Sequence, residues 1–158
     1  MSKKKKASTN KAIVNKRILA MLRQNSRRRS KEISTETKIP LKEVNAFMRN
    51  NNCIKKNTAI VDFERIGYKI KLFLALSVSS MQKESVEEFL TKSLHANTIH
   101  KINNGYDFLA ELIFKDMDES NNFIENLETR FRVYDKKEYY ILETKKEQIF
   151  MTNHNFVF

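Results

Sequence analysis

The sequence predicts an α+β chain in two parts, a (winged) helix-turn-helix domain followed by a ferredoxin-like β-α-β-β-α-β domain. Three observations lead to this prediction. Apolar residues recur at helical spacing through the first 56 residues, and after Gly67 they alternate at the spacing of strands. The charge divides at about the same place. Residues 1–56 hold 17 Lys and Arg against three Glu, a net charge of +14, whereas the rest of the chain has a net charge of −3.

The chain is predicted to begin with a tail and one helix. Its first ten residues, MSKKKKASTN, are polar and charged and lack periodicity, which is typical of a disordered basic arm. A helical pattern begins at Ala12, with Ile18 and Leu22 on one face. The polar run Asn25–Arg29 interrupts this pattern and ends the helix.

Two shorter helices are predicted next. Ser30 is a suitable N-cap for a helix over Lys31–Thr37. Pro40 suits the first turn of a third helix, Leu41–Arg49, which has apolar residues along one side. Three short helices, the last two joined by a brief turn, form a helix-turn-helix domain. The stretch Cys53–Asp62 is predicted to be a strand that leaves this domain.

Strands and helices alternate after Gly67. Asn104-Gly105 is the strongest hairpin signal, because both central positions of a type I′ turn need positive φ. The order β-α-β-β-α-β is that of the ferredoxin-like unit. Its elements are predicted over residues 70–78, 82–95, 98–103, 107–115, 118–130 and 139–144.

The expected organisation has five parts. They are a disordered basic arm (1–10), the helix-turn-helix domain (11–56), a linker strand (57–67), a dimerisation and effector domain (68–150) and an apolar tail (151–158). The tail and the residues just before it are apolar enough that we expect packing on a partner subunit, with a strand docked within the same chain as the alternative.

Composition excludes several classes of protein. No apolar run approaches the ~20 residues that cross a membrane, and no apolar signal segment follows the Lys-rich start. A single cysteine, Cys53, excludes an intrachain disulfide and a multi-cysteine zinc site. The sequence therefore predicts a soluble cytoplasmic protein without a membrane partner.

The basic half is expected to bind nucleic acid. On the third helix, Asn45 fits adenine and Arg49 fits guanine in the major groove, beside Lys42, with contacts to the DNA backbone alone as the alternative. The remaining cations are expected to neutralise phosphates. They are Lys3, Lys4, Lys5, Lys6, Lys11, Lys16, Arg17, Arg27, Arg28 and Arg29.

Five segments follow one another in a recognisable order between Asn15 and Glu147. They are NKRILAMLRQNSR, KEIS, IPLKEV, CIKKNTAIVDFERIGY and INNGYDFLAELIFKDMDESNNFIENL. This series resembles the Lrp/AsnC (leucine-responsive/asparagine-responsive) family of transcriptional regulators. The resemblance implies a DNA-binding homodimer that extends to an octamer, associates with the nucleoid and responds to a small amino acid.

The resemblance also places an effector site at the central hairpin. Its residues are Asn104, Gly105, Tyr106 and Asp107, with Met117 as an apolar wall, and a plain tight turn is the alternative. Three departures from the family stand out. The recognition helix is about one turn short. The hairpin glycine comes one residue late. Lys136–Glu138 precede a strand where the family often has threonines, which favours a charged or polar effector.

The sequence thus predicts a DNA-binding transcriptional regulator of the Lrp/AsnC type, with double-stranded DNA and a second copy of itself as partners. Two alternatives stay open. One is an architectural chromatin-type protein that coats DNA with little sequence specificity, and the other is a metabolite sensor whose basic half binds RNA. An enzyme is not expected, because the sequence has no catalytic motif, its histidines form no metal-ligand set, and no cofactor is implied.

Overall fold

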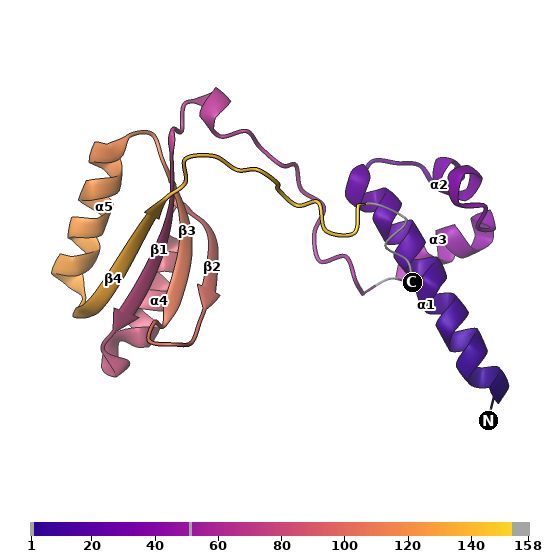
Figure 1. Cartoon of the computed structure of the whole chain (residues 1–158), viewed down its shortest axis with the longest axis horizontal. Helices are drawn as coiled ribbons and strands as arrows, with labels where there is room; N and C mark the ends of the chain where they lie inside the picture. The colour runs from indigo at the N-terminus through magenta and orange to yellow at the C-terminus, as the bar shows by residue number, and fades with distance from the viewer. Residues whose placement is uncertain (1, 51, 153–158) are drawn as a thin grey trace. The chain divides into compact units, whose positions relative to one another are not determined.

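The computed structural model describes residues 2–50 and 52–152, and side chains from residue 11 onward within these ranges. The chain divides into two compact units (Figure 1). One consists of residues 1–59 together with 145–158, and the other of residues 60–144. No helix in the described ranges is both long enough and apolar enough to cross a membrane.

The N-terminal unit contains the three predicted helices. They are α1 (Ser2–Gln24), α2 (Ser30–Thr37) and α3 (Leu41–Asn50). Each helix contributes apolar residues at three- and four-residue spacing to one small core, so the helical periodicity predicted the buried faces correctly. The buried members of this core are Ile18, Met21, Leu22, Ile33, Ile39, Val44 and Phe47.

The expected disordered arm over residues 1–10 needs correction, because α1 already begins at Ser2. Lysine and alanine favour helix, and the run Lys3–Ala7 continues into the amphipathic part without Gly or Pro. The sequence of this segment has no apolar periodicity, but a helix can form without such a pattern.

The start of α2 also differs in detail from the prediction. Ser30 is the first residue of the helix and not its cap. Instead, the Glu32 carboxylate accepts the backbone N–H of Arg29 at 3.2 Å. A glutamate at the third helical position can satisfy a free N–H at the helix start in this way, so the helix begins one residue earlier.

The turn between α2 and α3 places a lysine in an unusual backbone conformation. Lys38 ends α2 with φ of 57° and ψ of 23°, the left-handed region that favours glycine. Neighbouring hydroxyls hold the turn, since Ser34 Oγ donates to the Ile39 carbonyl at 2.7 Å and Thr37 Oγ1 donates to the Ile33 carbonyl at 2.5 Å. The turn thereby orients α3 against α2.

The predicted linker strand does not form. Residues 53–62 carry no strand. Among the described residues between α3 and the sheet, the one regular element is a 3-10 turn, η1 (Glu64–Ile66), that ends at Gly67 with φ of 97°. The described part of the N-terminal unit likewise contains no strand that could serve as a wing. A strand needs a neighbour to pair its backbone groups, which β-type composition alone does not supply.

The second unit is a four-stranded antiparallel sheet with the strand order β2-β3-β1-β4 (Figure 1), which confirms the predicted β-α-β-β-α-β order. Its strands are β1 (Ile70–Val78), β2 (Ala96–Lys101), β3 (Phe108–Phe114) and β4 (Val133–Tyr140). Its helices are α4 (Lys83–Lys92), preceded by the 3-10 turn η2 (Ser80–Gln82), and α5 (Met117–Arg130).

The last strand lies earlier than predicted. It covers residues 133–140 and not 139–144, and it pairs with β1 from Leu72 opposite Tyr140 to Val78 opposite Val133. The charged run Asp135–Glu138 concealed this strand in the sequence. An edge strand tolerates such charges, because much of its surface faces water.

Both helices cover the same face of the sheet. Every second residue of β1 is buried in one core with residues from α4 and α5, among them Val86 and Ile124. Because side chains alternate along a strand, Phe73 and Ala75 of β1 point to the opposite face. The sheet therefore has one face covered by helices and one face without such a cover among the described residues.

The C-terminal segment returns to the N-terminal unit. Arg23 of α1 donates to the carbonyls of Gln148 at 2.6 Å and Phe150 at 2.8 Å, and Gln24 donates to the carbonyl of Thr152 at 2.5 Å. The backbone of residues 148–152 thus contacts α1 of the same chain, while Phe150 is 70% exposed, so packing of this segment on a partner subunit stays a prediction. Residues 153–158 of the predicted tail lie outside the described residues.

We predict that Lys38→Gly stabilises the N-terminal unit by up to about 1 kcal/mol, because a left-handed conformation costs an L-residue roughly that amount and costs glycine nothing. Thermal denaturation followed by circular dichroism should show a higher melting temperature. Lys38→Asn, which also removes the charge but tolerates positive φ, should change stability less, and the β-branched Lys38→Val should lower it. A lower melting temperature for Lys38→Gly would contradict the strained turn.

Candidate nucleic-acid interface and effector hairpin

The outer face of α3 carries the side chains predicted to contact bases. Lys42 and Arg49 are exposed and Asn45 is half-buried, whereas Val44 and Phe47 are buried on the inner side. All three predicted residues line one shallow surface pocket. The structure therefore brings Lys42, Asn45 and Arg49 together on the side of the helix that is free to meet a ligand.

Other exposed cations lie in the same unit as this helix. Lys16 and Arg17 on α1, and Arg27 and Arg29 in the loop before α2, are all exposed. Within the described ranges no carboxylate forms an ion pair with any of them. Their charge is thus available to phosphate groups. The predicted contacts Lys3, Lys4, Lys5 and Lys6 have side chains outside the described residues.

Arg28 has a different role from its neighbours. Its guanidinium lies 2.5 Å from the Glu36 carboxylate of α2, and its side chain is only 22% exposed. It therefore holds the loop against α2 through one nitrogen, and its contact with phosphate stays a prediction. Sequence reasoning missed Lys31 and Lys38, which are exposed on and beside α2 and were visible only as part of the overall charge.

The Asn-Gly turn of the central hairpin is confirmed. Asn104 and Gly105 have φ of 68° and 93°, as a type I′ turn requires. The turn joins β2 to β3, and the N–H of Ile102 donates to the carbonyl of Asp107 at 3.0 Å. This part of the predicted effector site is therefore a well-formed tight turn.

Asp107 serves as a structural bridge. Its Oδ2 accepts the backbone N–H of Val78 at 2.9 Å, and its Oδ1 lies 2.5 Å from Lys83 Nζ at the start of α4. Its own N–H donates to the carbonyl of Leu76 at 2.7 Å. The hydrogen bond from Lys83, with a further one from the Val78 N–H, lowers the pKa of the Asp107 carboxyl. Both carboxylate oxygens are thus occupied in joining β1, β3 and α4.

Tyr106 faces the start of β4. Its hydroxyl donates to Asp135 Oδ2 at 2.6 Å, and this hydrogen bond raises the pKa of Tyr106. Lys137 Nζ lies 5.4 Å from the centre of the Tyr106 ring. The neighbouring Lys136 is paired with Glu128 at 2.9 Å and with Glu138 at 3.1 Å. Lys137 is therefore the cation near the hairpin whose ammonium has no ion pair within the described ranges.

Met117 does not belong to this group of residues. It begins α5 directly after β3, whereas the hairpin directly precedes β3. The seven residues of β3 separate the two positions, a span of about 23 Å at the usual strand rise. The prediction that Met117 forms a wall of the hairpin site was wrong, because the direction of the intervening strand places it at the far end of the sheet.

This chain is similar to known proteins in sequence and in fold. No family model matches the chain. In sequence it is similar to the HTH-type transcriptional regulator FL11 of Pyrococcus horikoshii, with 26% identity over 137 residues that cover 85% of this chain and 91% of that protein.

Solved structures give the same result for the fold. An AsnC family transcriptional regulator from Agrobacterium tumefaciens superposes with a TM-score of 0.72 at 15% identity, covering 85% of this chain and 92% of that one. A transcriptional regulator from Neisseria meningitidis, solved with L-methionine, has a TM-score of 0.76 at 17% identity and covers 85% and 91%. Bacillus subtilis LrpC has a TM-score of 0.77 at 15% identity and covers 84% and 95%. The two kinds of comparison confirm the resemblance predicted from the five segments.

We predict that Asp107→Asn lowers the free energy of unfolding by about 1–2 kcal/mol near neutral pH, since it removes a charged partner of Lys83. The folded state holds the Asp107 pKa below the value of about 3.9 of an unfolded aspartate. Its contribution to stability is therefore present above about pH 4 and is lost as the pH falls through the folded pKa.

Urea denaturation across this pH range measures the effect, with Asp118→Asn as the matched control because Asp118 is exposed at the start of α5. The difference between wild type and Asp107→Asn should shrink as the pH falls below about 4. A difference that stays constant with pH would show that the carboxylate charge does not stabilise the hairpin.

Proposed function

We propose that this chain, similar in sequence and in fold to the Lrp/AsnC regulators, regulates transcription by binding double-stranded DNA through its N-terminal unit. The observation that supports this most directly is the outer face of α3. It presents an amide and two cations, Asn45, Lys42 and Arg49, on a helix whose other side is anchored in a core. In helix-turn-helix proteins the second helix of the motif enters the major groove with such a face.

The proposed contacts divide by their chemistry. Arg49 can donate two hydrogen bonds to guanine, and Asn45 can bond adenine in the same bidentate manner. Lys16, Arg17 and the loop arginines can only neutralise phosphates, which adds affinity for any sequence. An architectural protein would need the second group alone. The presence of the first group, and the FL11 regulators as relatives, favour a regulator over a coating protein.

We propose that the second unit forms a homodimer through the uncovered face of its sheet. Phe73 of β1 lies directly opposite Tyr139 of β4, and Ala75 lies opposite Leu109 of β3. Phe73 is half-buried, and Tyr139 is 51% exposed. Glu111 and Lys137 share this face, opposite Phe73 and Ala75, so the apolar part is a strip bordered by charges. Such a strip is typical of an interface, and a symmetric dimer suits a symmetric operator. An octamer stays a prediction from the family resemblance.

An amino-acid effector near the hairpin is the finer part of the proposal. Each oxygen of Asp107 already has a partner within the chain, so Asp107 is a weaker candidate for holding a ligand ammonium. Lys137, above the Tyr106 ring, can instead meet a ligand carboxylate. The Neisseria meningitidis neighbour was solved with L-methionine, but a cation in this position suits a polar ligand better. A regulator of this type would act on the nucleoid in the cytoplasm.

We predict that Asn45→Ala and Arg49→Ala each relax the preference at one base pair, at a cost of about 1–3 kcal/mol on the preferred sequence. Lys16→Ala and Arg17→Ala should instead weaken binding to all sequences alike. Each should also reduce the slope of log affinity against log salt by about 0.9. Anisotropy titrations of selected and random duplexes at several salt concentrations measure both effects.

The matched control for charge is Arg132→Ala, an exposed arginine of the second unit that should leave the affinity for DNA unchanged. If Asn45→Ala and Arg49→Ala weaken binding to selected and random DNA equally, the architectural alternative holds. Stronger binding to folded RNA than to any duplex DNA would favour the RNA-binding alternative.

We predict that Tyr139→Glu shifts the full chain from dimer to monomer, because it places a charge beside Phe73 in the proposed interface. Sedimentation velocity at micromolar concentration measures the change. The control is Met81→Glu, which introduces the same charge at a 90% exposed apolar residue outside the sheet. A wild-type monomer, or a Tyr139→Glu variant that remains dimeric, would contradict dimerisation through this face.

A further inference from the structure

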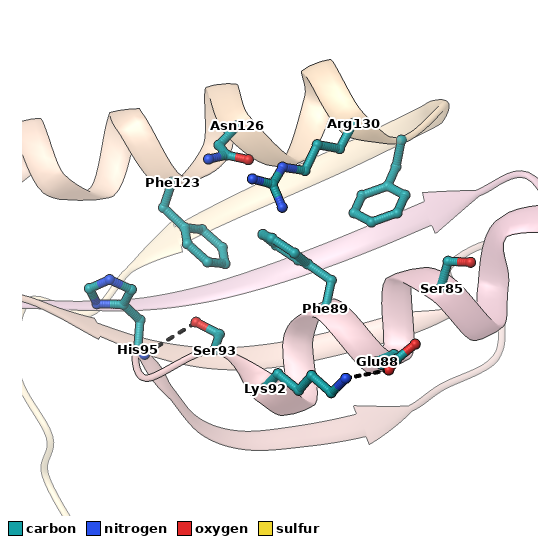
Figure 2. Close-up of a pocket in the computed structure, with 10 residues that line it drawn as sticks. Ser85, Glu88, Phe89, Lys92, Ser93, His95, Phe123, Asn126 and Arg130 are labelled. Atoms are coloured by element: carbon teal, nitrogen blue, oxygen red, sulfur yellow. Dashed lines mark hydrogen bonds and ion pairs between the residues drawn. The ribbon is translucent and has the colours of Figure 1, made fainter.

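A groove of about 520 Å³ lies between α4 and α5, and no residue of α3 or of the hairpin lines it. Figure 2 shows Phe89 extending from α4 towards α5, while Phe123, Asn126 and Arg130 extend from α5 towards α4. Its volume falls in the range of about 300–1,000 Å³ that is usual for small-molecule sites. The proposed contacts with DNA, the partner subunit and the hairpin effector use none of these side chains.

The groove is built on a continuous row of rings. Phe131 packs edge-on against Phe89 at 5.4 Å between ring centres, and Phe89 lies 5.6 Å from Phe123. Phe123 in turn lies 5.5 Å from Phe114, which is fully buried and stacks on His95 at 4.7 Å. Phe89, Phe123 and Phe131 are only half-buried. The exposed parts of the Phe89 and Phe123 rings, which are inclined by 31° to each other, offer an apolar surface that another ring can contact.

One cation at this groove is without a counter-ion. The guanidinium carbon of Arg130 lies 5.6 Å above the centre of the Phe89 ring, and no carboxylate within the described ranges pairs with it. The other cation of the rim, Lys92, is paired with Glu88 at 2.5 Å (Figure 2). The Asn126 amide lies one turn before Arg130 and also lines the groove.

We propose that this groove binds a small aromatic carboxylate, with its ring against Phe89 and Phe123 and its carboxylate on Arg130. The planar guanidinium fits a carboxylate through two parallel hydrogen bonds and keeps its place over an aromatic face. A neutral arene leaves the charge of Arg130 unused, and an aliphatic acid leaves the ring surface without a stacking partner. The combination of the two features therefore selects a molecule that carries both.

The test uses the full chain and indole-3-acetate as the probe. The protein has no tryptophan, so the indole can be excited without exciting its tyrosines. Saturable binding should raise the fluorescence anisotropy of the probe. Two competitors should displace the probe only at concentrations about tenfold higher than those at which indole-3-acetate itself binds. Indole-3-acetamide lacks the charge, and cyclohexylacetate lacks the aromatic ring. A tenfold loss corresponds to one lost charged hydrogen bond or stacking contact.

Two arginines provide a matched pair of variants. Arg130→Gln should weaken binding of indole-3-acetate about tenfold. Arg132→Gln should leave it unchanged, because Arg132 lies over Tyr134 at 5.5 Å and does not line the groove. Arg130 is exposed, so both variants should keep the wild-type melting temperature. Phe89→Leu should weaken binding several-fold, and if it also lowers the melting temperature, the arginine pair and the two competitors carry the test.

Several results would overturn the proposal. They are the absence of saturable binding, equal binding of the acid and its amide, or equal losses in Arg130→Gln and Arg132→Gln. Binding that disappears as the protein self-associates would show that a second copy occupies the groove. None of these results bears on the DNA-binding function, since the probe, the variants and the readout do not involve the N-terminal unit.

Discussion

The second unit depends on covering its sheet from one side only. Leu72, Leu74 and Leu76 of β1 are fully buried beneath α4 and α5, and each contributes about 2 kcal/mol of transfer free energy to the fold. Because the side chains of a strand alternate, the same strand must present Phe73 and Ala75 on the other face. One constraint thus produces both the surface proposed for a partner subunit and the pair of neighbouring helices between which the aromatic groove lies.

The first unit has a small core, and charged side chains make up much of its surface. Seven buried residues hold three helices together, and nearly every cation lies outside that core. Two arginines outside that core nevertheless have partners within the unit. Arg28 is bound to Glu36, and Arg23 holds the returning C-terminal segment. Both are chemically identical to the other arginines proposed to contact phosphate. Only their neighbours in space reveal these structural contacts.

The predictions that failed share a cause. The linker strand and the role of Met117 both depend on which segment lies beside which. A strand without a partner cannot form a ladder, and Met117 is separated from the hairpin because β3 runs away from it. Asp107 is a similar case. The sequence indicated a carboxylate beside a tight turn, but the Val78 N–H and Lys83 that occupy it come from segments about 25 residues earlier in the chain.

The sequence by itself determined the three helices, the order of the sheet unit, the Asn-Gly turn and the basic outer face of α3. Each of these depends on apolar spacing, backbone preference or charge over a few neighbouring residues, and such properties are local. The tertiary structure alone decided the strand limits of β4, the occupation of Asp107 and Arg28, and the meeting of Phe89 with Phe123 and Arg130 across two helices. These features arise from contacts between residues far apart in the chain, which no local pattern contains.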